Sequence, residues 1–161
     1  MTYLVWLSHT GLPTWARESE SIWAYPTILF LHTLGLSLLV GFATAIDLRI
    51  LGYSTALPLR SLRRFFRIVW TGFWINAASG TMLLIMTPAK LSNPTFDTKL
   101  VLIGLGVVTT LWIRREVFAA PARGSQGEAS RLGRWLAGGS LLLWGAAIIA
   151  GRLTAYIGNT R

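Results

Sequence analysis

The sequence predicts an all-α fold, an integral membrane four-helix bundle with an N-terminal interfacial amphipathic segment. Apolar residues make up 53% of the 161 residues, and the mean hydropathy is +0.53. Charged residues make up only 13% of the chain, whereas soluble domains carry about 25%. Four long apolar runs are separated by polar connections, and those after the first and third runs are rich in arginine. We therefore expect one transmembrane domain over residues 1–161 rather than a soluble enzyme.

The first two spans follow an amphipathic N-terminal region. Residues 1–23 place tryptophans among charged side chains, a pattern typical of a helix that lies in the membrane interface. The first span is predicted over about 24–46, where no charged residue occurs, and Pro26 fits the first helical turn because its missing N–H loses no hydrogen bond there. The second span is predicted over about 68–87, with Asn76 its most polar residue. Each run approaches the roughly 20 residues that a crossing needs.

The third and fourth spans end close to charged side chains. The uncharged part of the third run is short for a crossing, and the span reaches about 98–115 if Lys99 and Arg114 extend their charged ends to the two headgroup layers. The fourth span is predicted over about 135–157, with Arg152 tolerated near its end. Four spans therefore fit the chain, and the third is the least well marked.

The distribution of basic residues predicts the orientation of the spans. The connections after spans one and three carry Arg49, Arg60, Arg63, Arg64, Arg67, Arg114, Arg115, Arg123, Arg131 and Arg134. The other side of the membrane carries Arg17, Lys90, Lys99, Arg152 and Arg161. Because cytoplasmic connections are enriched in lysine and arginine, we expect both basic connections in the cytoplasm and both termini outside.

Several motifs resemble a known family. They are Trp23-Ala-Tyr-Pro26, Leu31-His-Thr-Leu-Gly35, Ala45-Ile-Asp-Leu-Arg-Ile-Leu-Gly52, Trp70-Thr-Gly-Phe-Trp-Ile-Asn-Ala-Ala-Ser-Gly80 and Asn93-Pro-Thr-Phe-Asp-Thr-Lys99. Over nearly the whole chain they resemble a family of uncharacterised bacterial four-helix membrane proteins. More distantly, one histidine in the first span and a lysine opening a later one resemble the copper-resistance protein D group, although no second intramembrane histidine is present. The resemblance implies a multi-pass protein of the bacterial inner membrane, in which the outside termini expected from the basic residues would lie in the periplasm.

His32 is the first candidate for a functional site because it lies inside the predicted first span. An ionisable side chain at that depth costs free energy and often marks function. One interpretation is an axial ligand to the iron of haem b, with Gly35 admitting the porphyrin to the backbone and His9 as a second ligand. The other is a neutral imidazole that hydrogen-bonds a serine or threonine of a neighbouring helix. The chain has 0 cysteines and 2 histidines, and no other metal site is expected.

Two charged residues near span ends also have two interpretations. Arg152 is a candidate for cofactor binding, because a guanidinium group can pair with a haem propionate, a quinone oxygen or a lipid phosphate; alternatively, it extends to the outer headgroups. Asp47 is expected to form a structural clamp with an arginine of a neighbouring helix end. The expected partners are Arg63, Arg64, Arg67 and Arg114.

Small residues predict where helices pack closely. Asn76, Ser79 and Thr81 share the second span with Gly72 and Gly80, a combination that favours close helix packing over ligand binding. Two further pairs of small residues, spaced four apart, suit close approach within the bundle or against another chain. These pairs are Gly41 with Ala45 and Ala147 with Gly151.

The basic segment 60–67 is predicted to contact lipid. Its residues Arg60, Arg63, Arg64 and Arg67 lie beside a span, where each basic residue attracts anionic headgroups by about 1 kcal/mol. Nucleic acid is not an expected partner, because the arginines lie where membrane topology requires them.

Two classes of function fit the sequence. The favoured one is a non-catalytic accessory or structural subunit that docks in a larger, possibly redox, membrane assembly, with another membrane protein or a second copy as its partner and no cofactor. The alternative is a small b-type haem- or quinone-handling redox protein that uses His32. The sequence leans against an enzyme, since it offers no acid pair, no nucleophile beside a base and no phosphate loop.

Overall fold

The computed structural model describes residues 11, 23–53, 58–87, 94–118 and 129–157. The helices in these ranges are α3 (Ala24–Leu51), α4 (Leu59–Leu62), α5 (Phe65–Met86), α6 (Pro94–Phe118) and α7 (Arg131–Ile157). The predicted all-α four-helix architecture is confirmed for this part of the chain. Most of the predicted interfacial segment, residues 1–23, lies outside the described residues.

All four long helices are apolar and long enough to cross a membrane, so the chain is a multi-pass membrane protein. The third span, the least well marked in the sequence, is one continuous candidate over Pro94–Val117. Only 17% to 28% of the residues in the most apolar windows are buried inside the protein. Large apolar side chains such as Leu142 and Trp74 are consequently exposed on the outside, where lipid would surround them in a membrane.

α3 extends beyond the predicted end of span one for a local reason. Gly52 adopts a left-handed conformation with φ 100°, and the N–H of Tyr53 donates to the carbonyl oxygen of Leu48 at 3.1 Å. This pattern is a glycine-dependent helix C-cap. The helix therefore continues through Asp47 and Arg49 until the first glycine that can supply the cap.

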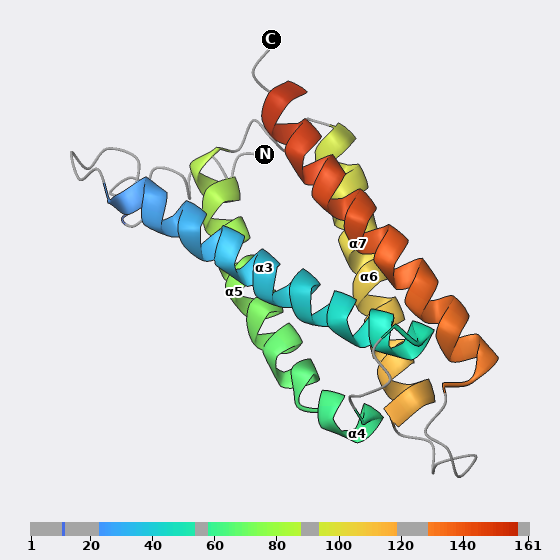
Figure 1. Cartoon of the computed structure of the whole chain (residues 1–161). Helices are drawn as coiled ribbons and strands as arrows, with labels where there is room; N and C mark the ends of the chain where they lie inside the picture. The colour runs from blue at the N-terminus through green and yellow to red at the C-terminus, as the bar shows by residue number, and fades with distance from the viewer. Residues whose placement is uncertain (1–10, 12–22, 54–57, 88–93, 119–128, 158–161) are drawn as a thin grey trace.

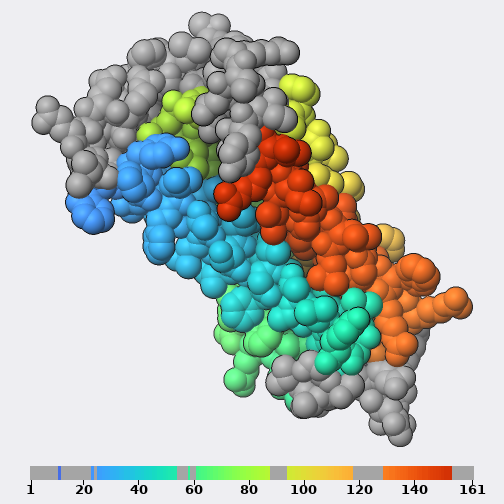
Figure 2. All heavy atoms as spheres, turned by 45° about the horizontal axis from the view of Figure 1, so that its top comes forward, coloured from blue at the N-terminus to red at the C-terminus, as the bar shows by residue number. Residues whose placement is uncertain are grey.

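The four long helices form two antiparallel pairs, α3 with α5 and α6 with α7, and α3 also packs against α7 (Figure 1). Figure 1 shows the start of α3 well separated from the end of α7, whereas the end of α3 lies near the start of α7. The space-filling view in Figure 2 shows the teal end of α3 against the orange part of α7. We call the end where α3 and α6 finish and α5 and α7 begin the arginine-rich end.

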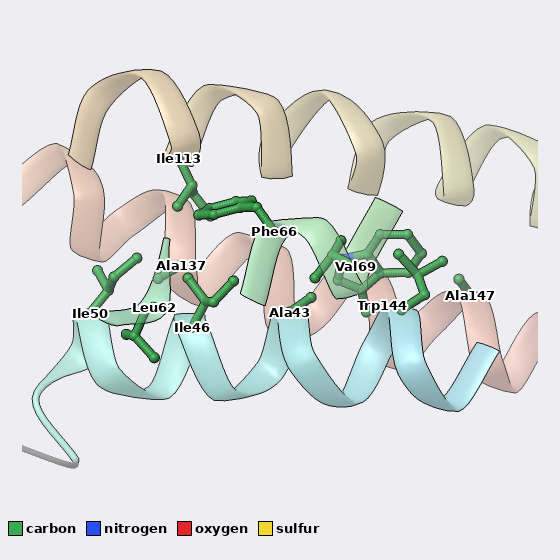
Figure 3. Close-up of a cluster of buried hydrophobic side chains, with 11 residues drawn as sticks. Ala43, Ile46, Ile50, Leu62, Phe66, Val69, Ile113, Ala137, Trp144 and Ala147 are labelled. Carbon is green, nitrogen blue, oxygen red and sulfur yellow. The ribbon is translucent and has the colours of Figure 1, made fainter. Parts of the chain in front are cut away.

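The hydrophobic core lies where the two pairs meet, toward the arginine-rich end (Figure 3). Its buried residues are Leu39, Ala43, Ile46 and Ile50 of α3, Leu62 of α4, Phe66 and Val69 of α5, Ile113 of α6, and Ala137, Trp144 and Ala147 of α7. A second cluster, Met86 with Ile28 and Met82, joins only α3 and α5. In the described ranges, the contact between the pairs is thus concentrated near one end.

Candidate functional site

α3 and α5 approach each other most closely at Gly35 and Gly72. A Cβ atom added to Gly35 would lie 2.6 Å from the backbone nitrogen of Asn76 and 2.9 Å from the carbonyl oxygen of Gly72. A Cβ added to Gly72 would lie 2.6 Å from the backbone nitrogen of Leu39 and 2.8 Å from the carbonyl oxygen of Gly35. Because backbone meets backbone here, both positions require glycine. The close packing predicted for the second span is confirmed.

His32 lies one turn before Gly35 and faces α5. Its Nδ1 atom lies 3.1 Å from the backbone oxygen of Asn76 and 3.2 Å from the hydroxyl of Ser79. The side-chain amide of Asn76 donates in return to the backbone oxygen of His32 at 2.8 Å. Nδ1 also lies 3.3 Å from the side-chain nitrogen of Asn76, which can only donate. We assign the proton to Nδ1 because the two oxygens lie closer to it and the backbone oxygen can only accept.

The Ser79 hydroxyl supports the same assignment. It donates to the backbone oxygen of Ile75 at 2.6 Å, which leaves its oxygen lone pairs to accept from His32 Nδ1. The hydrogen bond to a serine of a neighbouring helix, one of the two interpretations of His32, is therefore confirmed. The participation of Asn76 was not predicted, because the sequence does not give the register between two helices.

Haem ligation by His32 stays a prediction, but one part of it is wrong. Gly35 offers no space to a porphyrin, because the α5 backbone occupies that space. The imidazole also lies against Gly80, where an added Cβ would be 3.0 Å from Cε1. A fixed Nδ1 proton serves a ligating histidine as well as a packing histidine, so this feature is common to both interpretations.

The residues predicted to share a cofactor are not brought together in the described ranges. His32 packs on α5, whereas Arg152 is exposed near the end of α7. Figure 1 shows that the last turns of α7 lie away from the first turns of α3. His9 lies outside the described residues. The exposure of Arg152 favours the headgroup interpretation over pairing with a group held by His32.

Asp47 is buried, and its predicted clamp with an arginine is wrong. The residue is 2% exposed and faces α7, where the Ser140 side chain lies beside its carboxyl group. Within the described ranges, neither Asp47 Oδ2 nor the Ser140 hydroxyl has a hydrogen-bond partner. The reason is helical geometry. Asp47 shares the core-facing side of α3 with Ile46 and Ile50, and that side packs against α7.

Trp144 fills the space between α6 and α7. A Cβ added to Gly106 would lie 3.0 Å from the Cε2 atom of the indole ring. The Nε1 atom of Trp144 is buried and has no hydrogen-bond partner in the described ranges. Nearby, the hydroxyl of Thr110 donates to the backbone oxygen of Gly106 at 2.8 Å. Sequence reasoning missed that Trp144 and Ser140 belong to one buried α7 face, because apolar and small residues surround both.

Four arginines line an open pocket of about 400 Å³ at the arginine-rich end. The lining residues are Arg63, Arg64, Phe66, Arg67, Trp70 and Arg114. Three of these arginines are predicted lipid-contacting residues, and the fourth, Arg114, comes from α6. Arg60 lies in α4. Arg114 was expected at the same helix ends as these arginines, as a possible partner of Asp47. A shared pocket was not predicted, because its pocket partners lie more than 40 residues away along the chain.

The described residues contain no group of three histidine, cysteine, aspartate or glutamate side chains that could hold a metal ion. Their geometry supports two kinds of chemistry, hydrogen bonding between helices at His32 and attraction of anions at the arginine pocket. No family model, curated protein or solved structure matches the chain.

Proposed function

We propose that the protein is a non-catalytic accessory or structural subunit that docks in a larger assembly of the bacterial inner membrane. The observation that carries the proposal is a stripe of small residues on the outer surface of α3, formed by Ser37, Gly41 and Ala45. Spaced four residues apart, they lie on one side of the helix. Ser37 and Gly41 are exposed, and Ala45 is half-buried.

This small-residue stripe is suited to close approach by another transmembrane helix. A Cβ added to Gly41 would meet nothing within 4 Å, so the space beside it is open to an outside helix. The Ser37 hydroxyl already donates to the backbone oxygen of Thr33 at 2.9 Å. A partner helix would therefore meet small side chains with no unsatisfied hydroxyl, as close helix packing in membranes requires.

The use of the intramembrane polar groups also supports a structural role. His32, Asn76 and Ser79 bind one another across α3 and α5. Each hydrogen bond between membrane helices contributes on average about 0.6 kcal/mol. These groups help to hold the subunit together and leave its outer surfaces for association.

We propose that both basic connections face the cytoplasm and both termini face the periplasm. The positive-inside rule supports this orientation. The helix directions agree with it, because the ends of α3 and α6 and the starts of α5 and α7 lie at the same end of the bundle.

The alternative function is a small b-type haem- or quinone-handling protein. The observation that favours it is the hydrogen bond from His32 Nδ1 to Asn76, because a ligating imidazole needs its second nitrogen held in this way. The lack of space at Gly35 opposes it, since a porphyrin could not approach α3 on that side.

The proposed docking is tested by comparing Gly41→Leu with Gly104→Leu. Neither glycine has an atom within 4 Å of an added Cβ, so both variants should fold. Gly104 is the matched control because its α6 neighbours Val101, Leu105 and Val108 are large and exposed, which suits contact with lipid.

Extracted in mild detergent, the wild-type protein and Gly104→Leu should migrate in a complex larger than the 17.7 kDa chain. Gly41→Leu should associate at least about tenfold more weakly, a loss of about 1.4 kcal/mol, and shift toward the monomer. A wild-type protein that migrates only as a monomer, or equal dissociation of the two variants, would contradict the proposal.

A further inference from the structure

The arginine pocket brings together charges from helices that make little direct contact. Arg63 and Arg64 immediately precede α5, Arg67 lies in its first turn, and Arg114 lies near the end of α6. α5 and α6 belong to different helix pairs and share few contacts along their length. The pocket is therefore a place where one ligand would touch both pairs.

One residue that lines the pocket belongs to the hydrophobic core. Phe66 lines the pocket and is 3% exposed, and Ile113 precedes Arg114 and is 1% exposed. Figure 3 shows the side chain of Ile113 beside the ring of Phe66. The two helices that carry the arginines therefore meet in the core beside the pocket.

The four arginines lack acidic partners among the described residues. Asp47 faces α7, Asp97 lies in the first turn of α6 at the other end, and Glu116 accepts a hydrogen bond from Ser130 at 3.5 Å. The first turn of α5 holds no acidic residue, and its N-cap residue Arg64 makes no side-chain cap. The positive helix end adds to the four like charges, and an anion bound between them would relieve their mutual repulsion.

From this geometry, we propose that the pocket lined by Arg63, Arg64, Arg67 and Arg114 is a discrete binding site for the phosphate group of an anionic ligand. The planar guanidinium group binds phosphate oxygens in pairs. A volume of about 400 Å³ lies within the range of roughly 300–1,000 Å³ of small-ligand sites. Bound phosphate would link α5 to α6 and so stabilise the junction of the two helix pairs.

Two sources can supply this phosphate, an anionic phospholipid of the adjacent leaflet or a soluble phosphate compound. The rings of Phe66 and Trp70 add apolar surface beside the charges, which complements the amphiphilic body of a phospholipid. A discrete site differs from the general attraction of basic residues to a membrane surface. In a discrete site, the arginines that line the pocket determine the affinity for phosphate, and neighbouring arginines of equal charge do not.

The experiment uses the full chain in nanodiscs of neutral phosphatidylcholine at fixed ionic strength. In one arm, phosphatidylglycerol is titrated into the bilayer; in the other, inorganic pyrophosphate is added from solution. The wild-type protein should show a saturable rise in melting temperature in at least one arm, because a ligand that binds the folded state raises its stability. A response to phosphatidylglycerol alone identifies a lipid site, and a response to pyrophosphate identifies a site open to soluble phosphates.

The deciding comparison is Arg114→Gln against Arg115→Gln. Both side chains are exposed at the end of α6 and both substitutions remove one charge, but only Arg114 lines the pocket. Loss of charge-assisted hydrogen bonds should raise the apparent dissociation constant about tenfold in Arg114→Gln and leave Arg115→Gln within about twofold of wild type. Equal weakening in both variants, or no stabilisation of the wild type in either arm, would overturn the proposal.

Discussion

Replacing Gly72 with leucine is expected to force α3 away from α5 and to lower the free energy of unfolding by about 3 kcal/mol, near the upper end of the usual effect of overpacking. The added Cβ alone would lie 2.6 Å from the backbone nitrogen of Leu39 and 2.8 Å from the carbonyl oxygen of Gly35. Backbone atoms cannot rotate aside as a flexible side chain can, so one helix must move. That movement should also lengthen the hydrogen bonds between His32 and Asn76.

The loss is measured by unfolding the purified protein in mixed detergent micelles, with helix content and tryptophan fluorescence as readouts. Gly104→Leu is the control, because it makes the same chemical change in an α6 position with open space around it. Its stability should stay within about 0.5 kcal/mol of wild type, as for other surface substitutions. Equal stability of the two variants would show that α3 and α5 do not cross at Gly72.

Replacing Asp47 with asparagine is expected to stabilise the bundle by about 1–3 kcal/mol, the cost of leaving a buried polar group unsatisfied. Asp47 is 2% exposed, and its Oδ2 atom has no hydrogen-bond partner among the described residues. Asparagine has nearly the same shape, and its amide can donate to the Ser140 hydroxyl that lies beside the carboxyl group. The substitution removes a buried acid without creating a cavity.

Thermal unfolding of Asp47→Asn measures this gain, and Asp97→Asn provides a matched control. Asp97 is exposed in the first turn of α6, so the same substitution there should change the melting temperature little or lower it slightly through the helix dipole. A clear destabilisation by Asp47→Asn would contradict the unpartnered geometry and would indicate that the carboxylate has a charged partner.

The positions of the spans could be predicted because the need to cross a membrane constrains the amino-acid composition of each helix directly. A crossing helix needs a long apolar run, and such runs are visible without knowledge of the fold. The ends of the helices were predicted less accurately. α3 continues past Asp47 and Arg49 to the cap at Gly52, and charged residues near a membrane surface do not by themselves end a helix.

For individual polar residues, the sequence predicted the type of partner but not the particular residue. A serine or threonine was expected beside His32, and Ser79 fills that role, because a buried imidazole must find some partner. The arginine expected beside Asp47 was wrong, since the direction of a side chain depends on which helices are neighbours. Arg114 was expected at the same end as Arg63, Arg64 and Arg67, but the pocket that they share was not predicted, because packing between distant segments determines it.

The structural role of His32 leads to a definite expectation for its substitution. In His32→Ala, α3 and α5 lose the hydrogen bonds to Asn76 and Ser79, at an average of about 0.6 kcal/mol for each. The glycine contact between the two backbones stays in place. The helix content should therefore be unchanged, and the visible spectrum of the protein should be the same before and after the substitution.

The visible absorption spectrum of the purified wild-type protein, produced in cells supplied with ample haem, tests the central claim most directly. A subunit whose intramembrane polar groups bind one another should show no Soret band. A stoichiometric Soret band that disappears in His32→Ala while the helix content is retained would contradict the structural account and establish His32 as a haem ligand.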